Sequence, residues 1–173
     1  MASALNNLST YQDSDLPNAD EMTFGIIVAE WNAPITHALY EGCYDTLIKH
    51  GAKPDHIYTM QVPGSFELTI GARMLNSQQN VDAVICLGCV IKGETSHDEY
   101  INQAVAIGLT NLGLTTGKPH IFGLITTNNE QQAIDRAGGK HGNKGVEAAV
   151  TAIRMASLKK SPIQGKIKRP IGF

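Results

Sequence analysis

The stretch GCVIKGETSHDEY, residues 88–100, decides how the rest of this chain is interpreted. It follows a run at 83–87 that is typical of a buried strand, and a helical pattern comes after it. It therefore lies at the carboxyl end of a strand, where open α/β sheets usually bind ligands. Its two glycines, its hydroxyl pair and its histidine beside two carboxylates make it the first candidate for a functional site.

Strand-like and helix-like runs alternate on both sides of this stretch. Apolar, β-branched runs predict strands at 24–29, 57–62, 81–87 and 121–125. Helical periodicity predicts helices after each strand, the last ones at 130–137 and 146–158, with a glycine-rich joint at 138–145. The alternation favours right-handed crossovers and a parallel sheet covered on both faces. We predict an α/β fold, a flavodoxin-like or Rossmann-like sandwich with a four-stranded parallel sheet.

Three details of the helices follow from local chemistry. Asn32 can cap the helix that starts at Pro34, and Ser65 can cap the next one. In that second helix Phe66, Ile70 and Met74 fall on one face. Asn143 is a candidate cap for the last helix.

Composition narrows the class of protein. The 173 residues are 42% hydrophobic and 17% charged, with a net charge of −2. This balance gives no reason to expect nucleic acid or a membrane as a partner, and no apolar run approaches a membrane span. We expect one domain at 23–158, an extended or mobile segment at 1–22, a solvated basic tail at 159–173, and a cytoplasmic location.

Cysteine and histidine spacing does not predict a metal site. Cys43, Cys86 and Cys89 are too few for a disulfide framework, and no second pair completes a zinc site. We interpret Cys86 and Cys89 as small buried strand residues.

Polar clusters follow all four predicted strands. They are Trp31-Asn32, 64–67, 88–97 and 126–129. Because parallel strands end at one edge of the sheet, these clusters should converge on one site.

The central stretch resembles a phosphate-binding loop, with one contradiction. A Walker A loop needs a lysine where this chain has Glu94, so nucleotide hydrolysis is disfavoured. Gly93, Thr95 and Ser96 at a helix start could still bind one phosphate, and helix capping explains the hydroxyls equally well.

The other candidates each have a second interpretation. Histidine suits proton transfer, but His97 could also be a surface residue. The sole tryptophan, Trp31, could stack on a heterocycle or fill the edge of the sheet. Glu67 could accept bonds from ligand hydroxyls or respond to the helix dipole. Arg136 and Lys144 could hold an anion or only flank a turn.

Taken together, five blocks in order resemble the lumazine synthase family. They are Trp31-Asn32, VPGSFEL (62–68), LGCVIKGETSH (87–97), FGLITT (122–127) and AIDRAGGKHGNKG (133–145). The resemblance implies a flavodoxin-like fold and the condensation of 5-amino-6-(D-ribitylamino)uracil with 3,4-dihydroxy-2-butanone 4-phosphate. The products would be 6,7-dimethyl-8-ribityllumazine, phosphate and water, made without cofactor or metal.

The resemblance also implies roles for particular residues. His97 matches the proton-transfer residue, Trp31 the aromatic that stacks on the pyrimidine, and Glu67 the acceptor of ribityl hydroxyls. The remaining matches surround the ring and ribityl chain or the phosphate, and three of them come from a neighbouring subunit. Those around the ring are Asn32, Ser65, Phe66, Val90 and Ile91; those at the phosphate are Gly93, Glu94, Thr95 and Arg136; those from the neighbour are Phe122, Arg136 and Lys144.

Assembly is a further implication of the resemblance. Family members form pentamers, and in some of them twelve pentamers close into an icosahedral shell, with which riboflavin synthase can associate. The compact joint at 138–145 resembles that of shell-formers. Glu94 departs from the family, in which many members have a small residue there. A non-catalytic flavin or lumazine carrier on the same scaffold is the alternative function.

Overall fold

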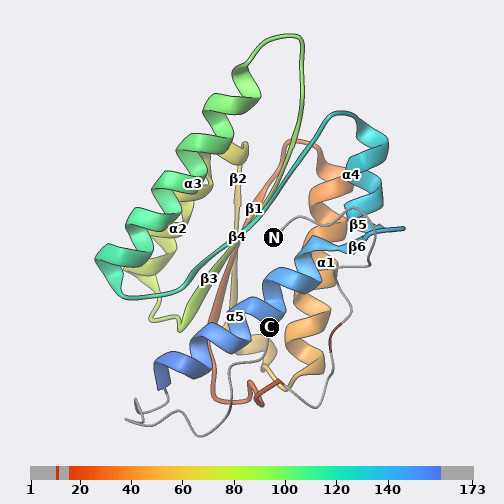
Figure 1. The fold of residues 1–173 in the computed structure, drawn as a ribbon. Helices are drawn as coiled ribbons and strands as arrows, with labels where there is room; N and C mark the ends of the chain where they lie inside the picture. The colour runs from red at the N-terminus through yellow and green to blue at the C-terminus, as the bar shows by residue number, and fades with distance from the viewer. Residues whose placement is uncertain (1–10, 12–15, 161–173) are drawn as a thin grey trace, which may run out of the picture.

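A four-stranded parallel sheet separates two layers of helices (Figure 1). The structure, a computed structural model, describes residue 11 and residues 16–160. The sheet strands are β1 Phe24–Ala29, β2 Ile57–Val62, β3 Ala83–Ile91 and β4 His120–Thr127. The α-helices are α1 Ala33–Lys49, α2 Leu68–Gln78, α3 His97–Thr116, α4 Glu130–Arg136 and α5 Lys144–Lys160. The predicted flavodoxin-like sandwich is confirmed.

The order of the strands in the sheet is β2-β1-β3-β4, so β1 and β3 are central. Helices α2 and α3 cover one face, and α1, α4 and α5 cover the other (Figure 1). Each face has its own apolar core, because the side chains of a strand alternate between the two faces. All six residues of β1 are buried, as its continuous apolar run predicted.

Strand β3 is longer than the sequence predicted. The prediction ended it at Leu87, whereas it continues through Ile91 and pairs with β4 as far as Ile91↔Thr127. Its pairing with β1 stops at Val28↔Leu87. The last four residues of β3 are therefore paired with a strand on one side only. The start of the central stretch is strand rather than loop.

The buried face of α2 is not the one that carries Ile70 and Met74. The large apolar residues Phe66, Ile70 and Met74 are 59%, 55% and 48% exposed. The helix instead buries Leu68, Gly71, Ala72 and Leu75. A Cβ on Gly71 would lie 2.8 Å from Val62 and 2.9 Å from Ile27, so small residues let the helix approach the sheet closely.

A small hairpin occupies the glycine-rich joint. Strands β5 Ala137–Gly139 and β6 Gly142–Asn143 are antiparallel and form a sheet of their own. Asp135 accepts a bond from Gln131 and pairs with Lys140 at 3.1 Å, which lowers the pKa of its carboxyl. The predicted cap at Asn143 is present, since its Oδ1 accepts a bond from the Gly145 N–H at 2.8 Å.

The described parts of the two terminal segments pack against the domain. Ala19 and Met22 are buried, although the sequence suggested an extended or mobile segment there. Lys159 and Lys160 belong to α5, and the Lys160 Nζ lies 3.0 Å from Asp82. The rest of the predicted basic tail, 161–173, lies outside the described residues.

We expect His120 to make the stability depend on pH. Its Nδ1 donates to the Lys118 carbonyl at 2.9 Å and its Nε2 accepts from the Asn76 amide at 2.7 Å, and the second of these bonds requires the neutral ring. Burial lowers the pKa of His120 in the folded state. The unfolded state then binds more protons below the ordinary histidine pKa, so stability falls as the pH is lowered through that range.

The measurement is the thermal midpoint of His120→Gln and of the wild type between about pH 7.5 and about pH 5.5. The variant should lose less stability on acidification than the wild type. Exposed His37 on α1 gives the matched control, His37→Gln. Equal losses in all three proteins would contradict the role of His120.

Candidate active site

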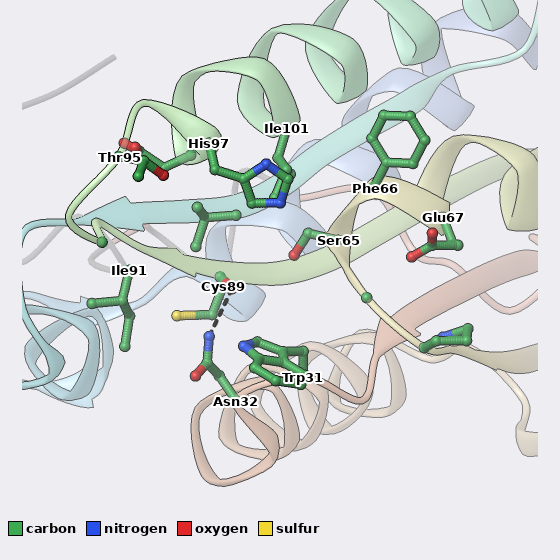
Figure 2. Close-up of a pocket in the computed structure, with 15 residues that line it drawn as sticks. Trp31, Asn32, Ser65, Phe66, Glu67, Cys89, Ile91, Thr95, His97 and Ile101 are labelled. Atoms are coloured by element: carbon green, nitrogen blue, oxygen red, sulfur yellow. Dashed lines mark hydrogen bonds between the residues drawn. The ribbon is translucent and has the colours of Figure 1, made fainter.

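One pocket collects polar residues from the ends of three strands. It has a volume of about 580 Å³ and lies where β1, β2 and β3 end and α3 begins. Figure 2 shows Trp31 and His97 on opposite walls, with Glu67 toward one end and Thr95 toward the other. The predicted site residues that line it are Trp31, Asn32, Ser65, Phe66, Glu67, Val90, Ile91, Gly93, Thr95 and His97.

Trp31 stands in the turn between β1 and α1. Its backbone N–H donates to Pro63 at 3.1 Å, and its side chain is 73% exposed. It does not fill the edge of the sheet, so its ring is free to stack on a planar ligand. Asn32 next to it has no side-chain capping bond, contrary to expectation, and its amide donates to the Cys89 carbonyl at 3.0 Å.

The segment after β2 forms a single 3₁₀ turn, η3 Ser65–Glu67. Ser65 makes no side-chain capping bond there, which corrects its predicted role. Its hydroxyl is buried without a hydrogen-bond partner among the residues that the structure describes, and a Cβ on Gly88 would lie only 2.7 Å from it. The hydroxyl therefore faces β3. Phe66 and Glu67 line the pocket beside it.

The third wall is built by the end of β3 and the first turn of α3. The first residue of α3 is His97, and Ser96 takes the N-cap position without a side-chain bond, so the capping interpretation of its hydroxyl is wrong. A helix start offers free N–H groups and a partial positive charge to an anion. Gly93 leaves the approach to this turn open, because a Cβ there would meet nothing within 4 Å.

The described residues that line the pocket include no lysine or arginine that could bind an anionic ligand. The ionisable lining of the pocket consists of Glu67, Asp98, His97 and Cys89. Burial raises the pKa of the Cys89 thiol to about 11, so it stays protonated and is a poor nucleophile. A phosphate in this pocket would face two carboxylates and would need a cation from elsewhere.

Four predicted site residues lie outside this pocket. Glu94 is exposed in the turn before α3, and Phe122 is 41% exposed on β4. Arg136 ends α4, and Lys144 begins α5, where it pairs with Glu147 at 2.8 Å. The fourth polar cluster, 126–129, also stays away: Thr126 bonds to Asn102, and Asn129 caps α4 by accepting from the Gln132 N–H.

Sequence reasoning missed several lining residues. Pro63, Asp98 and Ile101 line the pocket, and so does Cys89, which was interpreted only as a strand residue. One carboxylate oxygen of Asp98 is buried without a hydrogen-bond partner among the described residues. The sequence did not single out Asp98, because acidic residues are common in the first turn of a helix.

The described residues offer neither a metal cluster nor a helix suited to a membrane. Within residue 11 and residues 16–160, no group of three or more His, Cys, Asp or Glu side chains is placed to hold a metal ion. None of the helices in the same part of the chain has the length and apolar character to cross a membrane.

Comparison with known proteins gives a consistent picture. The family model for 6,7-dimethyl-8-ribityllumazine synthase matches residues 21–160. Curated relatives with that name include one from Cytophaga hutchinsonii, 56% identical over 155 residues (90% of this chain, 97% of the relative). The relative from Parabacteroides distasonis is 54% identical over 158 residues (91% and 99%). That from Flavobacterium johnsoniae is 47% identical over 170 residues (98% and 88%).

Proposed function

The chain belongs to the 6,7-dimethyl-8-ribityllumazine synthase family, and from that premise we propose how its pocket performs the family's reaction. The protein is a transferase of riboflavin biosynthesis. It condenses 5-amino-6-(D-ribitylamino)uracil with 3,4-dihydroxy-2-butanone 4-phosphate and releases phosphate and water.

The observation that carries the assignment of residues is the convergence of Trp31, Glu67 and His97 on one pocket. The Trp31 ring stacks on the pyrimidine, and Glu67 accepts bonds from the ribityl hydroxyls. Ser65, Phe66, Val90 and Ile91 form walls and offer backbone groups. The phosphate binds at Gly93, Thr95 and the start of α3.

The chemistry needs proton transfer and alignment. The amine of the pyrimidine attacks the ketone, and one water leaves to give a Schiff base. Phosphate is then eliminated, and the ring closes on the remaining carbonyl with loss of a second water. His97 moves protons at the start of α3, within the same pocket as both reacting groups. Holding the two substrates together supplies a large part of the rate enhancement.

The missing cation supports a shared site. Because no lysine or arginine among the described residues of this chain lines the pocket, we assign Arg136, Lys144 and Phe122 to the pocket of a neighbouring subunit. Each would complete the phosphate or ring contacts there. This arrangement requires an oligomer, and the resemblance to the family favours a pentamer.

The larger assembly is part of the same proposal. The compact hairpin β5–β6 favours a shell of twelve pentamers, which could associate with riboflavin synthase. Light scattering of the purified protein tests this preference, and a pentamer's mass alone would contradict it. The three cysteines are buried and free, which agrees with a cytoplasmic location.

The decisive experiment for function follows two products at once. Purified protein is mixed with both substrates, and lumazine fluorescence and phosphate release are recorded against the uncatalysed background. We expect both to appear together and in equal amounts. Binding of the ribityl substrate without turnover would instead support a non-catalytic carrier.

A further inference from the structure

An unusual backbone conformation lies beside the pocket. Asn32 has φ 62° and ψ 45°, and no other non-glycine residue of the described chain has a positive φ. A left-handed residue is strained unless the surrounding structure holds it, and such residues concentrate at functional sites. Asparagine tolerates this region better than most residues, which accounts for the residue type but not for the conformation.

The conformation lets Asn32 complete the sheet where β1 has ended. The N–H groups of Glu30 and Trp31 donate to Val62 and Pro63, on the side of β2, at 2.8 Å and 3.1 Å. Neither is available to β3, whose pairing with β1 stops at Leu87. The Asn32 amide therefore replaces a main-chain donor and satisfies the Cys89 carbonyl at 3.0 Å (Figure 2).

Two hydrogen bonds hold the chain at Trp31, one made by its own backbone and one made by the side chain of the next residue. Its own N–H is bonded to the end of β2, and the next residue is bonded to the end of β3. The carbonyl of Asn32 also accepts from Ile35 and Thr36 and so begins α1. The ring itself is largely exposed, so these two hydrogen bonds, rather than packing, determine where it stands.

We infer that Asn32 is a positioning residue, which acts through its left-handed turn and its bond to Cys89 to fix Trp31 against the pyrimidine substrate. One N–H of its amide is used by the Cys89 carbonyl, so this bond is the contact through which we assign its role. The inference rests on the proposed function only for the identity of the substrate.

Two variants separate the contributions of Asn32. Asn32→Gly keeps the freedom to adopt a positive φ but loses the bond to Cys89. Asn32→Asp keeps the size and the turn but places an acceptor against the Cys89 carbonyl. Thr46→Val is the matched control, because it removes another buried bond of α1, from the Thr46 hydroxyl to the Gly42 carbonyl.

Fluorescence of Trp31 provides a readout that needs no substrate, since the chain has a single tryptophan. We expect lower anisotropy of Trp31 in both Asn32 variants, and an unchanged value in Thr46→Val. With substrates, KM for the aminopyrimidine should rise about tenfold in both variants, while KM for the phosphate substrate changes less than about twofold.

Unchanged anisotropy in the folded Asn32 variants would overturn the inference. If KM for the aminopyrimidine rose all the same, Asn32 would act by direct contact with the substrate. If both variants fail to fold, a crystal structure of the wild type with the aminopyrimidine decides. An Asn32 amide that keeps its bond to Cys89 supports positioning, and one that has left Cys89 for the ligand refutes it. Wild-type protein without turnover would count against the proposed function, and the anisotropy test would remain valid.

Discussion

Replacing His97 with alanine should lower kcat about 100-fold and should leave a measurable reaction. The imidazole stands at the first residue of α3 and lines the pocket in which both substrates are proposed to meet. Losing it removes a proton carrier from the steps of Schiff-base formation and phosphate elimination. Alignment of the two substrates persists, because Trp31, Glu67 and the helix start are unchanged, and so part of the acceleration remains.

Steady-state rates of lumazine formation and phosphate release measure this effect, and quenching of Trp31 reports binding of the aminopyrimidine. His37→Ala is the matched control, since His37 is an exposed histidine near the start of a different helix. It should leave both constants unchanged. Complete loss of turnover with unchanged binding in His97→Ala would show that proton transfer, rather than alignment, supplies nearly all of the catalysis.

Much of the site could be predicted because strand ends obey a general rule. Parallel strands end at one edge, so Trp31, Glu67 and His97 were expected together although they are far apart in the sequence. The rule predicts that the segments after the strands lie at one edge of the sheet. It does not predict which of them contribute side chains to the pocket. Residues 126–129 end β4 at the same edge, yet Thr126 and Asn129 are committed to Asn102 and to the start of α4.

The features that could not be predicted from the sequence depend on long-range strand pairing and on close packing. Local composition suggested that β3 ends at Leu87, and only the partner β4 extends it to Ile91. The spacing of large apolar residues does not reveal the buried face of α2, because Gly71 contributes to the core through proximity rather than through apolar area. The left-handed turn of Asn32 is likewise invisible in a capping pattern, since it is linked to a bond with Cys89, a residue far away in the sequence.

Replacing Arg136 with alanine should raise KM for 3,4-dihydroxy-2-butanone 4-phosphate about 100-fold, with little change in KM for the aminopyrimidine. The pocket has two carboxylates and no cation from the described residues of its own chain, so the phosphate depends on a cation from outside. Arg154→Ala provides the control, because Arg154 is an exposed arginine on α5 that the proposed site does not use. Equal effects on both substrates would mean that Arg136 acts through the fold.

The same variant tests whether the site is shared between subunits. Subunits with His97→Ala and subunits with Arg136→Ala are each impaired alone, and the two are co-expressed so that they assemble together. If each pocket takes His97 from one chain and Arg136 from its neighbour, random mixing restores about one quarter of the sites to their full set of groups. If both groups came from one chain, no mixed site would be complete, and activity would stay at the average of the two variants. Turnover above that average in the mixture therefore requires that the Arg136 side chain cross a subunit boundary.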